Sequence, residues 1–289
     1  MYSPPPDLGT ARRMRAHHNR AARALGVTCD DGSELWGWAG RTLGRAGSAT
    51  DGRRVWLRLL TAPEAKATGK LWEGNQAAKK TFGTLGGRRP ELLAIHDTRE
   101  AGVVYRAELS AHLDMLVISA DPILRSTVEL SAGWWESLHS VLHAVADATT
   151  DRIAVRLGYL ERALPEFVGV PAPETIEWAV VHGDLHWANL TRPRLRVLDW
   201  EGWGQGPRGY DQATLLAYSL LQPDTSHRVR ECFPELGSPA TWTGEATVVA
   251  ELLQTVARGD NEELAEPLQA WAEQLCKRAR SYSTPHQTC

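Results

Sequence analysis

Two neighbouring segments decide the fold of this chain: Val181-His182-Gly183-Asp184-Leu185-His186-Trp187-Ala188-Asn189-Leu190 and Val197-Leu198-Asp199-Trp200-Glu201. The apolar runs Ile176–Val181 and Leu195–Leu198 lead into their polar residues and are typical of short strands. Two antiparallel strands, or a strand and the loop beside it, would bring Asp184, Asn189 and Asp199 to a common point. These side chains offer only oxygen ligands, which hard cations prefer. The pattern therefore predicts a site for Mg²⁺ and phosphate rather than for zinc.

The same residues resemble the aminoglycoside phosphotransferase and choline kinase family, a branch of the protein-kinase-like fold. That family carries H-G-D-x-x-x-x-N, then an apolar strand and D-[WF]-E, and the chain matches every chemically defining position. Protein kinases carry the related motifs H-R-D-x-x-x-x-N and D-F-G. The resemblance is strongest over residues 176–216. It implies an α+β, two-lobed protein-kinase-like fold, with a small β-rich N-terminal lobe over residues 1–108 and a larger helical C-terminal lobe over residues 109–289.

The resemblance also implies a role for each residue of the motif. Phosphoryl transfer needs alignment of the acceptor hydroxyl and neutralisation of charge more than covalent help from the protein. By resemblance, Asp184 is the catalytic carboxylate that accepts or orients the acceptor's proton, while Asn189 and Asp199 bind the metal ions. Supporting roles are expected for the surrounding residues: His182, which braces the catalytic loop, His186, which either faces the acceptor or packs in the core, Glu201 of the D-W-E motif, and Asp211.

The segment after the motif is predicted to be a loop followed by a helix. Residues 202–209 are too rich in glycine for a helix or a central strand. The helix is expected over about Tyr210–Leu221, with Asp211 near its start, where a carboxylate can cap free amides. The family carries a similar G-x-P-x-x-D segment whose Asp braces the catalytic loop. A structural rather than a catalytic role is therefore expected for Asp211.

The first third of the chain supplies the elements of a kinase-like N-terminal lobe. Strands are predicted over Glu34–Arg45 and Arg54–Leu60, and over Glu91–His96 and Val103–Leu109. A helix over about Ala62–Thr81 separates the two pairs. The order strand, strand, helix, strand, strand is the one that the resemblance implies.

Two features of this lobe depart from the usual kinase-like pattern. The glycines Gly40, Gly44 and Gly47 are spaced more widely than in G-x-G-x-x-G. Arg58 stands where the nucleotide-binding Lys is expected, with Glu73 on the next helix as its expected partner. Arginine keeps the positive charge but presents a planar fork instead of a point charge. The backbones of Ala107 and Leu109 are expected to hold adenine at the hinge between the lobes.

Apolar periodicity predicts that the rest of the chain is helical. One long helix carries an apolar face that includes Trp134, Trp135 and Leu138, and further helices are expected over Asp151–Phe167, Ala246–Arg258 and Glu262–Lys277. Pro267 should kink or restart the last of these helices.

Composition and charge limit the environment in which the chain works. The chain has 289 residues, 43% of them apolar and 23% charged, and a net charge of −3, which implies no general attraction to nucleic acid. Apolar runs are shorter than the roughly 18 residues of a membrane span, and a signal peptide is not visible, so a cytoplasmic location is expected. The basic helix about Asp7–Leu25 is predicted to be a solvated face. Four cysteines without short paired spacing (Cys29, Cys232, Cys276, Cys289) are expected to be reduced.

The sequence thus predicts an ATP- or GTP-dependent, Mg²⁺-dependent phosphotransferase, a monomer or homodimer, acting on a hydroxyl of a small molecule. An aminoglycoside-type antibiotic, with a role in resistance, an amino sugar or another metabolite is the expected acceptor. The acidic residues Glu251, Asp260, Glu262 and Glu263 form either a face for a cationic acceptor or a solvated helix boundary.

Two alternatives stay open. A nucleotide-binding pseudokinase without turnover is favoured by Arg58 and by the absent glycine loop, but opposed by the intact Asp184, Asn189 and Asp199. A metal hydrolase could use His182, Asp184 and His186 as ligands, although such sites need further histidines.

Overall fold

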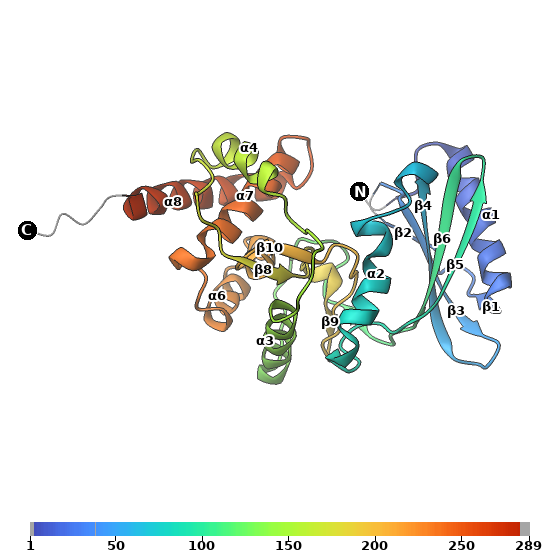
Figure 1. The fold of residues 1–289 in the computed structure, drawn as a ribbon. Helices are drawn as coiled ribbons and strands as arrows, with labels where there is room; N and C mark the ends of the chain where they lie inside the picture. The colour runs from blue at the N-terminus through green and yellow to red at the C-terminus, as the bar shows by residue number, and fades with distance from the viewer. Residues whose placement is uncertain (1–2, 38, 284–289) are drawn as a thin grey trace, which may run out of the picture. The chain divides into compact units, whose positions relative to one another are not determined.

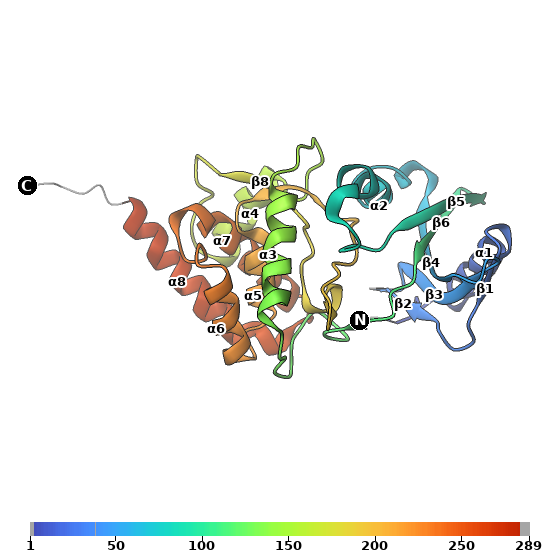
Figure 2. The same cartoon turned by 90° about the horizontal axis from the view of Figure 1, so that it is seen from below.

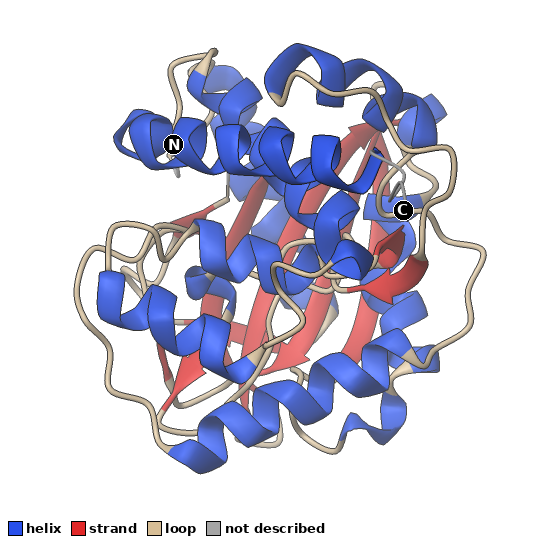
Figure 3. Ribbon diagram, turned by 90° about the vertical axis from the view of Figure 1, so that its left-hand side faces the viewer, coloured by secondary structure: helices blue, strands red, loops and turns tan. Residues whose placement is uncertain are grey.

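The computed structural model describes residues 3–37 and 39–283 and divides the chain into two units, Met1–Asp114 and Met115–Cys289 (Figure 1). The first unit is built on an antiparallel sheet and the second mainly on helices, which gives the α+β composition that the sequence predicts (Figure 3). Residue 108, where the sequence analysis places the boundary, lies inside strand β6 (Val103–Ala111).

The first unit contains a six-stranded antiparallel sheet in the order β1-β3-β4-β6-β5, with β2 paired to β3. Its remaining strands are β1 (Val27–Cys29), β2 (Leu35–Trp36), β3 (Thr42–Ala49), β4 (Arg54–Pro63) and β5 (Leu92–Glu100). The helices are α1 (Leu8–Ala24), which begins at the N-cap Asp7, and α2 (Lys70–Thr81).

The two helices cover opposite faces of this sheet (Figure 2). Residues of β4 alternate between the faces, because successive side chains of a strand point in opposite directions. Val55, Leu57 and Leu59 pack in the core beneath α1, whereas Leu60 packs against Trp72 of α2. Arg58 lies two residues before Leu60 and therefore on the same face of β4, the face that carries α2.

Three boundaries in this unit differ from the sequence prediction. Strand β4 continues to Pro63 because its partner β6 pairs with it as far as Val103. The helix predicted from Ala62 therefore begins only at Lys70, after a 3₁₀ turn at Glu64–Lys66. Strand β3 continues past the predicted end at Arg45 to Ala49. Within this extension Gly47 approaches β1 so closely that a Cβ would lie 2.5 Å from the carbonyl oxygen of Thr28.

The basic helix α1 is more than a solvated face. Its buried side packs on the sheet, and two of its arginines form ion pairs, Arg15 with Glu34 at 2.6 Å and Arg20 with Glu100 at 2.7 Å. Acidic side chains of the same unit thus neutralise part of the positive charge of α1.

The second unit is mainly helical and carries two small antiparallel pairs of strands. Its elements in chain order are β7 (Leu116–Val117), α3 (Ala132–Ala146), α4 (Leu157–Phe167), β8 (Trp178–Val181), β9 (Thr191–Arg192), β10 (Gly204–Pro207), α5 (Tyr210–Ala217), α6 (Pro223–Cys232), α7 (Trp242–Val256) and α8 (Ala265–Ser283). β8 pairs with β10, and β7 pairs with β9. α7 is the buried centre, packed against α4, α5 and α8.

One strand prediction and one loop prediction near the motif are wrong. Leu195–Leu198 forms only an isolated bridge, Val197 to Leu190, instead of a strand. The glycine-rich segment predicted as a loop contains β10, because small residues are needed where it meets its neighbours. A Cβ on Gly204 would lie 2.7 Å from the backbone nitrogen of Ala154, and one on Gly206 would lie 2.8 Å from a methyl group of Val181.

Three helices of the second unit begin at other residues than predicted, and one was missed. α4 begins at Leu157 instead of Asp151 and α8 at Ala265 instead of Glu262, whereas α7 begins earlier, at Trp242 instead of Ala246. α6 was missed because few of its residues are apolar, and only Thr225 and Val229 are buried. Pro267 lies in the first turn of α8, directly after a 3₁₀ turn, where a missing N–H costs little.

Two expectations about the environment can be compared with the described residues. Cys29, Cys232 and Cys276 are free thiols, and Cys289 lies outside the described part. Among the described helices, none combines the length and apolarity that a membrane span requires.

Candidate active site

Strand β8 leads directly into the loop that carries the motif, and a buried carboxylate holds the loop in place. The backbone N–H of His182 donates to Asp211 Oδ2 at 2.6 Å, and the N–H of Gly183 donates to Oδ1 at 2.9 Å. Asp211 is only 3% exposed and lies in the first turn of α5. The structure thus places Asp211 beneath the loop, where it bonds the loop's amides rather than those of its own helix.

Gly183 is required by its conformation. Its φ is +82°, a region that residues with a Cβ rarely adopt, and a Cβ here would lie 2.7 Å from the carbonyl oxygen of Gly202. The ring of His182 is fully buried, and its Nε2–H donates to the carbonyl oxygen of Leu198 at 2.9 Å. It also meets Trp200 edge to face at 4.8 Å. His182 therefore joins the two halves of the motif.

The loop brings Asp184, His186 and Asn189 together. The Asn189 side-chain amide donates to the backbone oxygen of Asp184 at 2.9 Å and to its Oδ2 at 3.2 Å. His186 Nε2 lies 3.5 Å from Asp184 Oδ1 and 3.3 Å from Asn189 Nδ2. The Asp184 side chain is 49% exposed, whereas that of His186 is 6% exposed. Asp184 thus keeps access to a reactant while its neighbours fix its orientation.

The second half of the motif lies next to the first. The backbone N–H of Leu198 donates to the carbonyl oxygen of Asn189 at 2.8 Å, so the following Asp199 is adjacent to Asn189. Asp199 has a φ of +54°, an uncommon backbone conformation for a residue other than glycine. Trp200 is buried and donates from its indole N–H to the carbonyl oxygen of Val197 at 2.7 Å.

Glu201 and its neighbours are held by Arg152, a residue that sequence reasoning missed. The Arg152 guanidinium donates to the carbonyl oxygens of Glu201 and Trp203, each at 3.1 Å. Its guanidinium carbon also lies 4.8 Å from the centre of the Trp203 ring. No local pattern pointed to Arg152, because its partners are about fifty residues further along the chain.

Charges within the loop shift two pKa values in opposite directions. Burial acts to raise the pKa of Asp184, but the charge and hydrogen bond of His186 outweigh it, and the pKa is lowered. Burial acts to lower the pKa of His186, but the nearby Asp184, with a further contribution from Asp199, raises it. Asp184 is therefore ionised at neutral pH and can accept a proton or a hydrogen bond from a hydroxyl group.

In the first unit, Arg58 has a different partner from the one expected. Arg58 lies opposite Glu108 of β6, and their side chains form an ion pair at 3.9 Å. Glu108 is 3% exposed and also accepts a hydrogen bond from Asn75 of α2 at 2.7 Å. Glu73 instead accepts from the backbone N–H of Gly69 at the start of α2. The expected Arg58–Glu73 pair is wrong, because the sheet register sets Glu108 beside Arg58.

Ala107 and Leu109 lie within the sheet and not at its end. β6 has β4 on one edge and β5 on the other, so its backbone groups are used in the two ladders. Both side chains belong to the core beneath α1. The backbone groups expected to hold adenine are therefore already used. Strand β6 was predicted to end at Leu109, but it continues to Ala111.

The glycines between β2 and β4 have packing roles. A Cβ on Gly44 would lie 2.2 Å from the indole of Trp56, which covers this position from the next strand.

Two of the acidic residues of the second unit that were considered for a cationic acceptor have partners within the unit. Glu251 accepts from the Tyr210 hydroxyl at 2.5 Å, and Glu263 pairs with Arg125 at 2.5 Å.

The two units have the architecture of the protein-kinase-like phosphotransferases, a sheet-based unit followed by a helical unit that carries the H-G-D loop. Aminoglycoside phosphotransferase APH(4)-Ia has this fold, with a TM-score of 0.61 at 13% identity over 91% of this chain and 98% of that one. Amicoumacin kinase hAmiN matches with a TM-score of 0.57 at 10% identity over 94% and 96% of the two chains. Macrolide 2'-phosphotransferase MphH from Brachybacterium faecium matches with a TM-score of 0.52 at 16% identity over 89% and 98%.

The sequence alone gives no comparable match. No protein-family model matches the chain, and no curated protein matches it. The predicted two-lobed kinase-like fold, and with it the resemblance to the aminoglycoside phosphotransferases, is confirmed at the level of the fold.

Proposed function

We propose that this chain is a Mg²⁺-dependent phosphotransferase that moves a phosphoryl group from ATP, or from GTP, to a hydroxyl group of a small molecule. The observation that carries the proposal is the pairing of Asp184 with Asn189 on a loop fixed by buried Asp211, with Asp199 of the following segment adjacent to Asn189. Solved structures of the same fold support it, since a thermostable mutant of APH(4)-Ia was captured with ADP and hygromycin B, and amicoumacin kinase hAmiN with AMP-PNP, Ca²⁺ and Ami.

The residues present fit a hard divalent cation. Asn189 uses its amide nitrogen for Asp184, so its oxygen is the atom that remains for a cation. Asp199 adds a carboxylate, and oxygen donors of this kind suit Mg²⁺. When bound, the ion supplies the positive charge that phosphate oxygens need for transfer. Asn189 and Asp199 are the residues that would hold it.

Asp184 is the residue that we expect to act on the acceptor. Its side chain is half exposed, its pKa is lowered, and Asn189 and His186 fix its two oxygens. A carboxylate held in this way can orient an acceptor hydroxyl and take its proton. His182 and Asp211 fix the backbone that carries it and touch no reactant.

Arg58 is the residue of the first unit that we expect to bind phosphate oxygens. Its side chain is 17% exposed, on the α2 side of the sheet. The contacts among Asn75, Glu108 and Arg58 link the position of α2 to that of the guanidinium. Glu108 thus takes the place in which the sequence analysis expected Glu73.

The alternatives are less well supported. In a metal hydrolase His182 would be a ligand, but its ring is fully buried and its Nε2–H is bonded to the carbonyl oxygen of Leu198. A pseudokinase would not need the Asp184–Asn189 contact that the chain makes. The acceptor class is proposed from the fold neighbours, whose names refer to an aminoglycoside, a macrolide and amicoumacin. An antibiotic hydroxyl, reached in the cytoplasm, is thus the first to test.

The first experiment is thermal unfolding of the whole chain with ATP and with GTP, each with and without Mg²⁺. Binding to the folded state raises Tm. We expect a rise that needs Mg²⁺, followed by transfer of labelled phosphate to at least one member of an antibiotic and amino-sugar panel. Asp184→Asn should keep the Tm shift and lose the transfer. Binding without transfer above this variant would identify a pseudokinase, and no binding of either nucleotide would overturn the proposal.

A further inference from the structure

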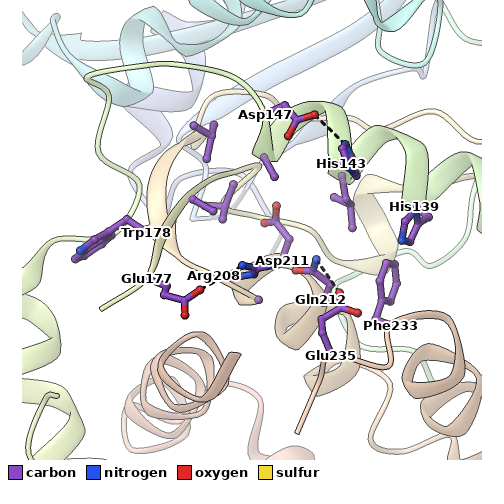
Figure 4. Close-up of a pocket in the computed structure, with 16 residues that line it drawn as sticks. His139, His143, Asp147, Glu177, Trp178, Arg208, Asp211, Gln212, Phe233 and Glu235 are labelled. Carbon is purple, nitrogen blue, oxygen red and sulfur yellow. Dashed lines mark hydrogen bonds and ion pairs between the residues drawn. The ribbon is translucent and has the colours of Figure 1, made fainter. Parts of the chain in front are cut away.

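A pocket of about 490 Å³ lies in the second unit, away from the residues assigned to phosphoryl transfer. It is formed by α3, β8, the start of α5 and the segment after α6 (Figure 4). The deepest residues, among them Val180, Asp211 and Phe233, are more than nine-tenths buried. Among the described residues that line it, Asp184, Asn189 and Asp199 do not occur. We call this cavity the β8-edge pocket.

One edge of β8 faces the pocket without a partner strand. Gln205, which lies opposite Val180, uses its N–H for the Arg152 carbonyl and its C=O for the Ala154 N–H, both on the side away from β8. Their pair is therefore a non-hydrogen-bonded pair, and the N–H and C=O of Val180 point away from β10 as well. The N–H of His182, two residues further on, points in this direction and reaches Asp211.

This edge presents polar backbone groups to the pocket. Val180 is 7% exposed, and within the described part of the chain no hydrogen bond to its N–H or C=O is found. Buried backbone groups of folded proteins are almost always paired with protein, water or ligand. The unpaired edge therefore offers one backbone donor and one backbone acceptor to a ligand in the pocket.

The charges of the lining residues indicate which charge a ligand of this pocket would carry. Its charged pairs lie at the two ends, Glu177 with Arg208 at 3.2 Å and Asp147 with His143 at 2.9 Å (Figure 4). Between them are two carboxylates, Asp211, bound only to backbone amides, and Glu235, whose Oε1 accepts a long hydrogen bond from the side-chain amide of Gln212 at 3.5 Å. Among the described lining residues there are four carboxylates, Asp147, Glu177, Asp211 and Glu235, and one arginine, Arg208, so the charge of the pocket is negative overall.

We propose that the β8-edge pocket binds a small organic cation, an ammonium group on an apolar body, and that this ligand acts on the catalytic loop through Asp211. The ammonium donates to Glu235, to the remaining lone pairs of Asp211 and to the Val180 carbonyl. The apolar body packs on Leu142 and Phe233. The volume is within the range of small-molecule sites.

The position of Asp211 gives the ligand a route to the catalytic loop. Burial raises the pKa of Asp211, so a cation beside it favours the ionised form that accepts from His182 and Gly183. Occupation of the pocket should therefore tighten the loop that carries Asp184. This inference does not depend on the proposed function, because binding can be measured without nucleotide.

The test is calorimetric titration of the whole chain with tryptamine, compared with indole-3-propionate and tryptophol, which share the ring but are anionic and neutral. We expect tryptamine to bind at millimolar or lower concentration and the anion not to bind. Glu235→Gln should weaken tryptamine by about tenfold, the effect of losing one charged hydrogen bond. Ala146→Trp, at an exposed position that lines the pocket, should abolish binding by filling it.

Two controls separate this pocket from other sites. Glu273→Gln removes an exposed carboxylate of α8 outside the pocket, and Asp184→Asn removes the catalytic carboxylate. Both should bind tryptamine as the parent does, and unchanged Tm values show that all variants are folded. The proposal is overturned if tryptamine does not bind, if the anion binds equally well, or if Glu235→Gln and Ala146→Trp bind like the parent. A loss in Asp184→Asn alone would also overturn it, since binding would then be at the catalytic loop.

Discussion

At the scale of the residue, Asp184 and Asp199 should fail in different ways when they are replaced. Asp184 is fixed by Asn189 and half exposed, whereas Asp199 is expected to hold the cation. Asp184→Asn should lower kcat by at least about a hundredfold, the usual contribution of a positioned base, with nucleotide affinity retained. Asp199→Asn should weaken nucleotide binding only when Mg²⁺ is present. Turnover assays and calorimetry check both, and wild-type turnover in either variant would remove the role assigned to that residue.

Arg58 offers a second test at this scale, because its partner is a buried carboxylate. The side chains of Arg58 and Glu108 are 17% and 4% exposed. Arg58→Ala should lower the free energy of unfolding by about 3 kcal/mol, since it removes a cation that pairs with the buried Glu108 carboxylate. Arg53→Ala removes an arginine whose pair with Asp51 is mostly exposed, and little change is expected there. Urea unfolding measures both, and equal losses in the two variants would show that the Arg58–Glu108 pair contributes no more to stability than an exposed ion pair.

At the scale of the element, the turn from β8 into the catalytic loop depends on Gly183. Gly183→Ala must place a Cβ 2.7 Å from the Gly202 oxygen at a φ of +82°. Gly169→Ala is a matched control, with a φ of +76° and nothing within 4 Å of the added atom. The control should cost about 1–2 kcal/mol from backbone strain alone. Gly183→Ala should cost clearly more and should also lower turnover, as measured by urea unfolding and by kinetics. Equal losses of stability in Gly183→Ala and Gly169→Ala would mean that the backbone at Gly202 moves away from the added Cβ without cost.

The elements also show which parts of this fold the sequence can predict. α1 was predicted as a basic helix and the strands β4 and β6 as β-prone runs, and Asp184 and Asn189 meet because their spacing along one loop brings them together. β10 was missed because its glycines are selected by close contacts with Ala154 and Val181, which no local pattern records. The Arg58–Glu108 pair depends on the register between β4 and β6. A carboxylate within the apolar strand Val103–Ala111 was the signal that could have indicated it.

At the scale of the whole molecule, the two units should respond in opposite ways to acid. In the first unit, burial lowers the pKa values of His17 and His18 below 6.5. His18 donates from Nε2 to the carbonyl oxygen of Leu57, and its Nδ1 is buried without a partner, so added charge there has no acceptor. In the second unit, the pKa of His186 is raised, chiefly because Asp184 outweighs the effect of burial.

The signs follow from proton binding in the folded and unfolded states. A histidine with a lowered folded pKa binds its proton more readily when unfolded, so the first unit loses stability as pH falls through about 6.5. His186 contributes stability that is present below 6.5 and is lost as pH rises through its raised pKa. The measurement is hydrogen exchange at about pH 7.5 and about pH 5.5, corrected for intrinsic rates. It should show easier opening of α1 and β4 at the lower pH, where the protonated His186 should instead stabilise the folded form of the second unit. His18→Gln keeps a donor for Leu57 and removes one titrating ring, so it should reduce the acid sensitivity of the first unit alone. Opening of α1 that is the same at both pH values in the parent chain would contradict the assignment of His17 and His18 as buried, uncharged histidines.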